Sequence, residues 1–187
     1  MDWIRLEHFN DVVSFDDILL LPQYSAVRTR KDIQTDVYLY TRDKNVKYRL
    51  KVPFISSPMD TVTEEEMAYQ MTKYGGLGII HRYFSNIEDQ CDVVRKFWQI
   101  IATRGEVVTD PIVGAAVGAT GDYKERAVAL VNSGVQVICV DVAHGHHVHM
   151  KEALKELTQT LPSYVHIMAG NVATPADRDW ETSTQIT

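Results

Sequence analysis

The stretch "VQVICVD" (Val135–Asp141) decides the fold class. It is a short, continuous apolar run that ends on a carboxylate. A run without polar alternation is typical of a strand buried on both faces, as in a parallel sheet covered by helices. A helix-type segment that starts at Asp122 and stops at Gly134 precedes it, and another over His147–Thr160 follows. We therefore expect a strand–helix repeat in a parallel α/β protein.

The same alternation recurs along the chain from Val52 onward. Strands are expected at Val52–Ser57, Gly76–His81, Ile112–Gly118, Val135–Asp141 and Tyr164–Gly170. The other helices are expected over Glu64–Tyr74, with a capping box of Thr63 and Glu66, and over Ile87–Trp98. Such regularity fits a doubly wound sheet or a (β/α)8 TIM barrel, and polar residues at the strand ends favour the barrel.

The chain divides into three parts by pattern. Residues 1–51 predict an N-terminal arm with a short hairpin around Asp43-Lys44-Asn45, and residues 52–177 predict a partial barrel. "WQIIATRGEVVTD" (Trp98–Asp110) is expected to be an irregular connection. The tail "RDWETSTQIT" (residues 178–187) breaks the rhythm. We therefore expect a barrel truncated after about five βα units, since a complete one needs roughly 250 residues.

Composition excludes several classes of protein. The net charge of −6 gives no basic footprint for nucleic acid, and no apolar run is long enough for a membrane span. The N-terminus lacks the pattern of a secretory signal. Cys91 and Cys139 have no disulfide-framework spacing, which indicates reduced thiols in a cytoplasmic protein.

Four histidines crowd the stretch "DVAHGHHVHM" (Asp141–Met150). Their spacings of 2, 1 and 2 do not place a pair on one helical face as i, i+4 spacing does. Zinc would need two further ligands, for which His81 and His166 are the candidates. We favour a nucleotide-facing loop over a metal site. Asp141 can accept from sugar hydroxyls, and Gly145 permits a close backbone approach. His147 and His149 are assigned to the following helix, as solvated or partly packed residues.

Other strand ends carry polar residues with open interpretations. In "SSPMDTVTE" (Ser56–Glu64), serines and Asp60 follow a strand, either as ligand contacts or as a polar loop that starts the next helix. Asn171 offers an amide to a ligand, or is a turn residue that tolerates left-handed geometry. His81 is expected to be a hydrogen-bonded structural histidine.

Taken together and in order, these motifs resemble the IMP dehydrogenase/GMP reductase family. The matching stretches are "SFDDILLLP" (Ser14–Pro22), "VPFISSPMDTVTEEEMA" (Val52–Ala68), "GGLGIIHR" (Gly75–Arg82), "DVAHGHH" and "MAGNVATP" (Met168–Pro175). "SSPMDTVTE" is closer to the dehydrogenase branch. The resemblance implies a (β/α)8 barrel that acts on a purine nucleotide with a nicotinamide cofactor, usually as a homotetramer.

The resemblance also implies roles for individual residues. Ser57 and Met59 match positions that contact the nucleotide substrate, and Asn171 matches an asparagine near the substrate and the catalytic loop. The segment that meets the nicotinamide-ribose side of the cofactor corresponds to Asp141, Ala143, His144 and Gly145.

Two departures from the family pattern set the functional expectation. No pair of CBS regulatory domains separates the second helix from the third strand. The family's nucleophilic cysteine lies in a "GSICTT"-type loop after the sixth strand, and neither Cys91 nor Cys139 matches it. We therefore assign no catalytic residue and no monovalent-cation site, and the histidine spacing leads us to assign no metal ligand.

The family activity expected is NAD-dependent oxidation of IMP to XMP, with this chain alone inactive or nearly so. The partners expected are a purine nucleotide and either further copies in a homo-oligomer or a second polypeptide that supplies the later strands. The alternatives are a GMP reductase that uses NADPH, a non-catalytic partner of full-length family members and, last, a metal-dependent hydrolase.

Overall fold

The computed structural model describes residues 16, 19–44 and 47–172. The chain divides into two compact units, Met1–Gln34 and Thr35–Thr187. In the first, the short 3-10 helix η1 (Arg30–Asp32) is closed by a capping box of Thr29 and Asp32. The end of the expected partial barrel, at residues 173–177, and the tail at 178–187 lie outside the described residues.

The second unit contains a five-stranded parallel sheet whose strands follow one another in chain order. Its strands are β3 (Ile55–Ser56), β4 (Leu77–Ile80), β5 (Val113–Val117), β6 (Val137–Val140) and β7 (His166–Ala169). A doubly wound sheet would reverse its strand order at a switch point, and this sheet does not. The described strands and helices therefore form a half-barrel, and the expected barrel-type α/β fold is confirmed.

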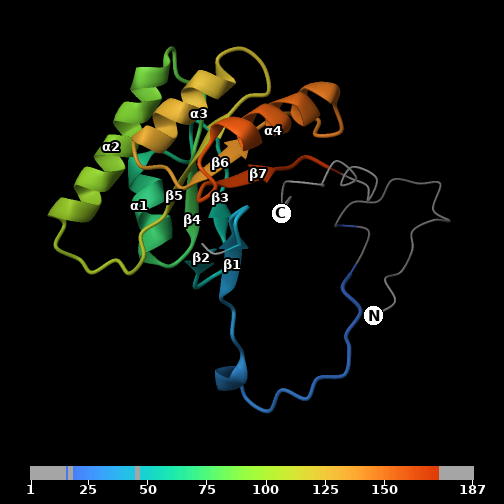
Figure 1. Cartoon of the computed structure of the whole chain (residues 1–187). Helices are drawn as coiled ribbons and strands as arrows, with labels where there is room; N and C mark the ends of the chain where they lie inside the picture. The colour runs from blue at the N-terminus through green and yellow to red at the C-terminus, as the bar shows by residue number, and fades with distance from the viewer. Residues whose placement is uncertain (1–15, 17–18, 45–46, 173–187) are drawn as a thin grey trace. The chain divides into compact units, whose positions relative to one another are not determined.

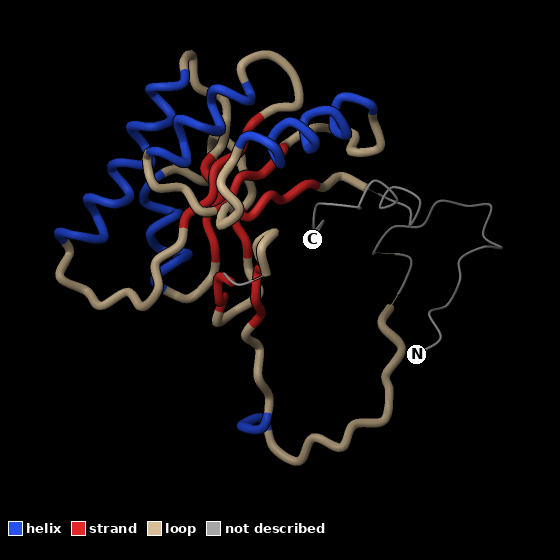
Figure 2. Tube along the Cα trace, in the orientation of Figure 1, coloured by secondary structure: helices blue, strands red, loops and turns tan. Residues whose placement is uncertain are grey.

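Four helices connect the strands and lie together on one side of the sheet (Figure 1). They are α1 (Glu65–Lys73), α2 (Ile87–Thr103), α3 (Tyr123–Asn132) and α4 (Val148–Thr160). Figure 2 shows the strands as an inner layer with the helices outside them. The main hydrophobic cluster fills the space between these layers, with Phe97, Leu130, Ile138 and Leu157 among its buried members.

Three local expectations were wrong. Thr63 does not cap α1, because its hydroxyl donates to the carbonyl of Ser57 at 2.7 Å and contacts the Ser56 hydroxyl at 2.9 Å. Strand β3 has only two residues, since Pro53 has no amide proton for a ladder. Helix α2 continues to Thr103, five residues past Trp98, because Ile100 and Ile101 still pack on the core.

A hairpin of β1 (Val37–Tyr40) and β2 (Lys47–Leu50) belongs to this second unit. Leu39 and Leu50 of the hairpin pack with Leu77, Ile79 and Val137, which lie on the sheet face opposite the helices. The two faces of the sheet are thus covered by different elements. Among the described residues, no helix combines the length and apolarity that crossing a membrane requires.

Candidate functional site

A cavity of about 330 Å³ lies at the carboxyl ends of β4, β5 and β6. Three segments that follow these strands line it, together with the first turn of α4: Arg82, Gly118–Thr120, Asp141–His144, His147, His149 and Met150. Carboxyl ends of parallel strands are where α/β proteins hold their ligands. A volume of this size suits part of a small organic ligand.

The charged centre of this cavity is the pair formed by Arg82 and Asp141. The guanidinium Nε of Arg82 lies 3.2 Å from Oδ2 of Asp141, and both side chains are partly exposed. The backbone amide of Asp141 donates to the carbonyl of Val117 at 2.8 Å, which fixes the end of β6 against β5. The pair offers a ligand both a carboxylate acceptor and a guanidinium donor. The sequence indicated Asp141 and missed Arg82.

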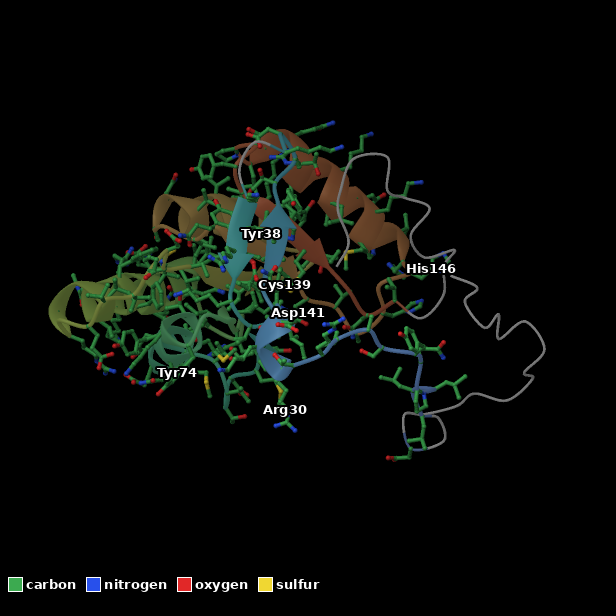
Figure 3. All side chains as sticks on the ribbon, turned by 90° about the horizontal axis from the view of Figure 1, so that it is seen from below. Arg30, Tyr38, Tyr74, Cys139, Asp141 and His146 are labelled. Carbon is green, nitrogen blue, oxygen red and sulfur yellow. The ribbon has the colours of Figure 1, made fainter. Side chains whose placement is uncertain are left out.

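Of the four histidines in Asp141–Met150, three line the cavity and one of these three also caps α4. His147 is the N-cap of α4, and its Nδ1 accepts from the backbone amide of His149 at 3.2 Å. His144, His147 and His149 line the cavity, whereas His146 lies well apart from Asp141 (Figure 3). Among residues 16, 19–44 and 47–172, no group of three or more His, Cys, Asp or Glu side chains is placed to hold a metal ion.

Gly145 and Asn171 join the end of β6 to the end of β7. The Gly145 amide donates to the Asn171 carbonyl at 2.9 Å, and a Cβ at Gly145 would lie 2.2 Å from the Gly170 carbonyl oxygen. Asn171 has the left-handed φ of 57° that the turn interpretation anticipated, and its Nδ2 lies 3.4 Å from the Ala143 carbonyl. The close backbone approach at Gly145 is therefore to the neighbouring strand end.

Ser57 and Met59 lie after β3, at the same edge of the sheet but outside the cavity lining. Met59 is 51% exposed, and the Ser57 carbonyl accepts from the Met59 amide at 2.8 Å. Strands β4 and β5 separate them from Asp141 in the sheet order. Of the expected cofactor residues, Asp141, Ala143 and His144 line this one cavity, whereas Gly145 packs against the end of β7 outside the lining. The expected substrate residues Ser57, Met59 and Asn171 also lie outside the lining.

His81 has a structural role, as anticipated. It is buried, its Nδ1 accepts from the Tyr83 amide at 3.1 Å, and its Nε2 lies 3.1 Å from the Glu64 carboxylate. Its ring stacks on Phe84 with the ring centroids 4.2 Å apart. Both ring nitrogens are engaged, so His81 orients the segment that leads to Arg82.

Neither cysteine has the character of a nucleophile. Cys91 is buried on α2. Cys139 lies within β6, two residues before Asp141 (Figure 3). Burial, with a smaller contribution from the Asp141 carboxylate, raises the pKa of Cys139 to about 12. A thiol with this pKa is protonated at neutral pH, and the thiolate is the reactive form.

Comparison with known proteins agrees with this geometry. The sequence profile of the "IMP dehydrogenase / GMP reductase domain" matches residues 12–180. An inosine-5′-monophosphate dehydrogenase of Cryptosporidium parvum is 36% identical over 87% of this chain and 46% of its own length. One of Borreliella burgdorferi is 32% identical over 88% of this chain and 49% of its own length.

GMP reductases match as well. GMP reductase 2 of Homo sapiens is 29% identical over 88% of this chain and 45% of its own length. The chain thus spans about half the length of the curated relatives it matches. Proteins of this family are NAD(P)-dependent oxidoreductases that bind purine nucleotides. With a match over most of its residues, the chain belongs to the IMP dehydrogenase/GMP reductase family.

Proposed function

We propose that this chain carries the cofactor-facing part of an IMP dehydrogenase site. Asp141, Ala143, His144 and Gly145 would face the nicotinamide ribose of NAD. Ser57, Met59 and Asn171 would face IMP. The observation that carries the proposal is the cavity around Arg82 and Asp141, at the strand end where the family resemblance expects the cofactor.

The residues around this cavity fit a nicotinamide ribose. Arg82 engages Oδ2 of Asp141, which leaves Oδ1 to accept from a ribose hydroxyl. The Arg82 guanidinium and the N-terminus of α4 would offer N–H donors to nearby phosphate groups at this end of the cavity. NAD bound here would supply the hydride acceptor for oxidation of the purine. The chain's own residues would hold the ribose and exclude water from it.

Binding of the cofactor is not sufficient for catalysis. The family resemblance implies that oxidation of IMP also requires a cysteine thiolate that attacks the purine. Cys91 is buried on a helix and Cys139 has its pKa raised to about 12. Incorrect placement of reacting groups costs orders of magnitude in rate. We therefore propose that the 187 residues bind the nicotinamide cofactor without oxidising IMP themselves.

Two measurements on the purified chain test this proposal. Fluorescence titration should show binding of NADH, and Asp141→Asn should weaken it by about tenfold, the value of one hydrogen bond to a charged group. Asp92→Asn, on the outer helix α2, is the matched control and should leave the affinity unchanged. Lack of NADH binding would contradict the cofactor site, and IMP-dependent formation of NADH would contradict the absence of catalysis.

A GMP reductase is the second candidate. A GMP reductase of Leishmania donovani matches 45% of this chain and is 46% identical over that part. A reductase of this family would bind NADPH and GMP in place of NADH and IMP. Titration with NADPH in the presence of GMP distinguishes the two: tighter binding of NADPH than of NADH would favour the reductase.

The partners we propose are the purine nucleotide and a further polypeptide, either another copy in a homotetramer or a chain that completes the barrel. Strands β3 and β7 each have one hydrogen-bonded neighbour among the described residues. A strand with one free edge can pair with another chain. Sedimentation equilibrium of the purified chain distinguishes the homotetramer from pairing with a different chain. A mass four times that of the chain would indicate the homotetramer, and the mass of a monomer would contradict the homotetramer.

A further inference from the structure

Gln90 is a polar side chain in the main core, on the sheet-facing side of α2. It is 0% exposed. Its Nε2 donates to the carbonyl of His81 at 2.8 Å and to the carbonyl of Ala116 at 2.9 Å. A buried amide that satisfies two carbonyls on different strands stabilises their relative position, since leaving either carbonyl without a donor is costly.

These carbonyls lie where the backbone pairing of β4 with β5 stops. The last paired residues are Ile80 and Ala115, and His81 and Ala116 come directly after them. The Gln90 amide therefore continues the connection between the two strands by one residue, through a side chain. Beyond this point each strand enters the cavity wall.

Both charged residues of the cavity are connected to the peptide groups that Gln90 contacts, Arg82 through a covalent bond and Asp141 through a hydrogen bond to the next residue. The His81 carbonyl belongs to the peptide bond that leads into Arg82. The Ala116 carbonyl belongs to the peptide bond of Val117, whose own carbonyl accepts from the amide of Asp141 at 2.8 Å. Gln90 thus contacts the backbone that sets the Arg82–Asp141 distance of 3.2 Å, although it does not line the cavity.

A second buried group fixes the orientation of the Gln90 amide. Nη1 of Arg126 donates to Oε1 of Gln90 at 3.0 Å, and the same guanidinium pairs with Asp122 at 2.7 Å. The side chain of Arg126 is 8% exposed. Because a guanidinium can only donate, Oε1 must face it, and Nε2 must face the strand carbonyls.

We infer that Gln90, oriented by Arg126, is a positioning residue for the cofactor site: it holds the strand ends that place Arg82 beside Asp141. The inference rests on the proposed function, because it takes the Arg82–Asp141 cavity as the place where the cofactor binds. It adds a residue that the cofactor never touches.

A double-mutant cycle on the full 187-residue chain tests this, with NADH as the probe. Gln90→Met keeps the volume and removes the amide, and should weaken NADH binding by about tenfold. Arg82→Met should weaken it similarly. If Gln90 acts through Arg82, adding Gln90→Met to Arg82→Met should change the dissociation constant by no more than about threefold. A full tenfold effect in both backgrounds would overturn the inference.

Phe97→Leu provides the matched control. It removes volume from the same face of α2, two turns from Gln90, and should lower stability without changing NADH affinity. Should Gln90→Met fail to fold, Arg126→Lys keeps the cation, loses the planar contacts and should weaken binding less strongly. Equal affinity losses in Phe97→Leu and the Gln90 or Arg126 variant would overturn the inference.

A measurement without ligand separates this inference from the proposed function. The ¹⁵N signal of the Arg82 Nε–H group, assigned with Arg82→Lys, reports on its contact with Asp141. Gln90→Met should shift this signal and Phe97→Leu should not. A shifted signal in a chain that does not bind NADH would support the positioning role and reject the cofactor site. An unshifted signal would overturn the positioning role whatever NADH does.

Discussion

His166 should make the stability of this protein depend on pH in a narrow, mildly acidic range. The residue lies at the start of β7 and is 2% exposed. Its Nδ1 donates to the Tyr40 carbonyl of the hairpin at 2.8 Å. Its Nε2 is buried and has no hydrogen-bond partner among the described residues. Burial lowers the pKa of His166, and the bond to Tyr40 offsets this only in part.

The direction of the effect follows from the proton balance. Below about pH 6.5, the usual pKa of histidine, the unfolded chain binds a proton that the folded chain rejects. The contribution of His166 is therefore complete above that pH and is lost as the pH falls toward the lowered folded pKa. One such group changes the free energy of unfolding by at most about 1.4 kcal/mol per pH unit.

Carboxylates act in a different range. Hydrogen bonds from Arg104 and Arg126 lower the pKa of Glu66 and Asp122, so their contributions are lost only as the pH falls below about 4.5. The interval from about pH 6.5 to about pH 5 thus isolates the imidazole from these groups.

Urea unfolding followed by circular dichroism, repeated across that interval, measures the effect. His166→Asn keeps an amide donor near the Tyr40 carbonyl and cannot take up a proton. Its unfolding free energy should fall less steeply with decreasing pH than that of the wild type. His149→Asn controls for the loss of an exposed imidazole. If His166→Asn retains the wild-type slope, the burial of an uncharged His166 is not the cause and the reasoning is refuted.

Three other predictions concern the side chains of Arg42 and Cys139 and the backbone at Gly145. Arg42→Met removes a guanidinium that donates to carbonyls at the end of α4, and should lower the free energy of unfolding by about 2 kcal/mol. The exposed Lys155→Met is its control in the same denaturation assay, and equal losses would contradict the role. Cys139, with its pKa near 12, should react with iodoacetamide at about pH 8 roughly a thousandfold more slowly than free cysteine. Mass spectrometry measures this, and rapid labelling of the folded chain would refute it. Gly145→Ala would place a Cβ 2.2 Å from the Gly170 carbonyl oxygen, so the loop must move and NADH affinity should fall by tenfold or more.

The regular repeat of strands and helices could be predicted from sequence because each strand is apolar and each helix has one apolar face. The exact ends of the helices were harder to predict. The Thr63–Glu66 spacing is a good cap signal, yet the Thr63 hydroxyl bonds to the strand-end loop at Ser57. Helix α2 continues past Trp98 because its next apolar residues find the core. In both cases a tertiary contact overrode a local preference.

In the candidate site, too, some residues could be predicted from the sequence and one could not. Asp141 could be predicted because it ends a buried strand, and Arg82 could have been found by the same rule, since it follows "GLGIIH". Gln90 could not. In sequence it is one polar residue on a helix, and its importance depends on two strand carbonyls that only the fold brings within reach.

The structure also separates stability from chemistry along the strands. At the amino-terminal end of β7, His166 bonds to the hairpin, whose Leu39 and Leu50 pack beneath the sheet. At the carboxyl end of the sheet lie the charges of Arg82 and Asp141. Substitutions of Leu39, Leu50 or His166 should therefore lower the free energy of unfolding and leave NADH affinity unchanged. Substitutions of Arg82 or Asp141 should weaken NADH binding and leave the free energy of unfolding nearly unchanged. Gln90 links the two roles, because one buried amide both satisfies core carbonyls and sets the geometry of the charged pair.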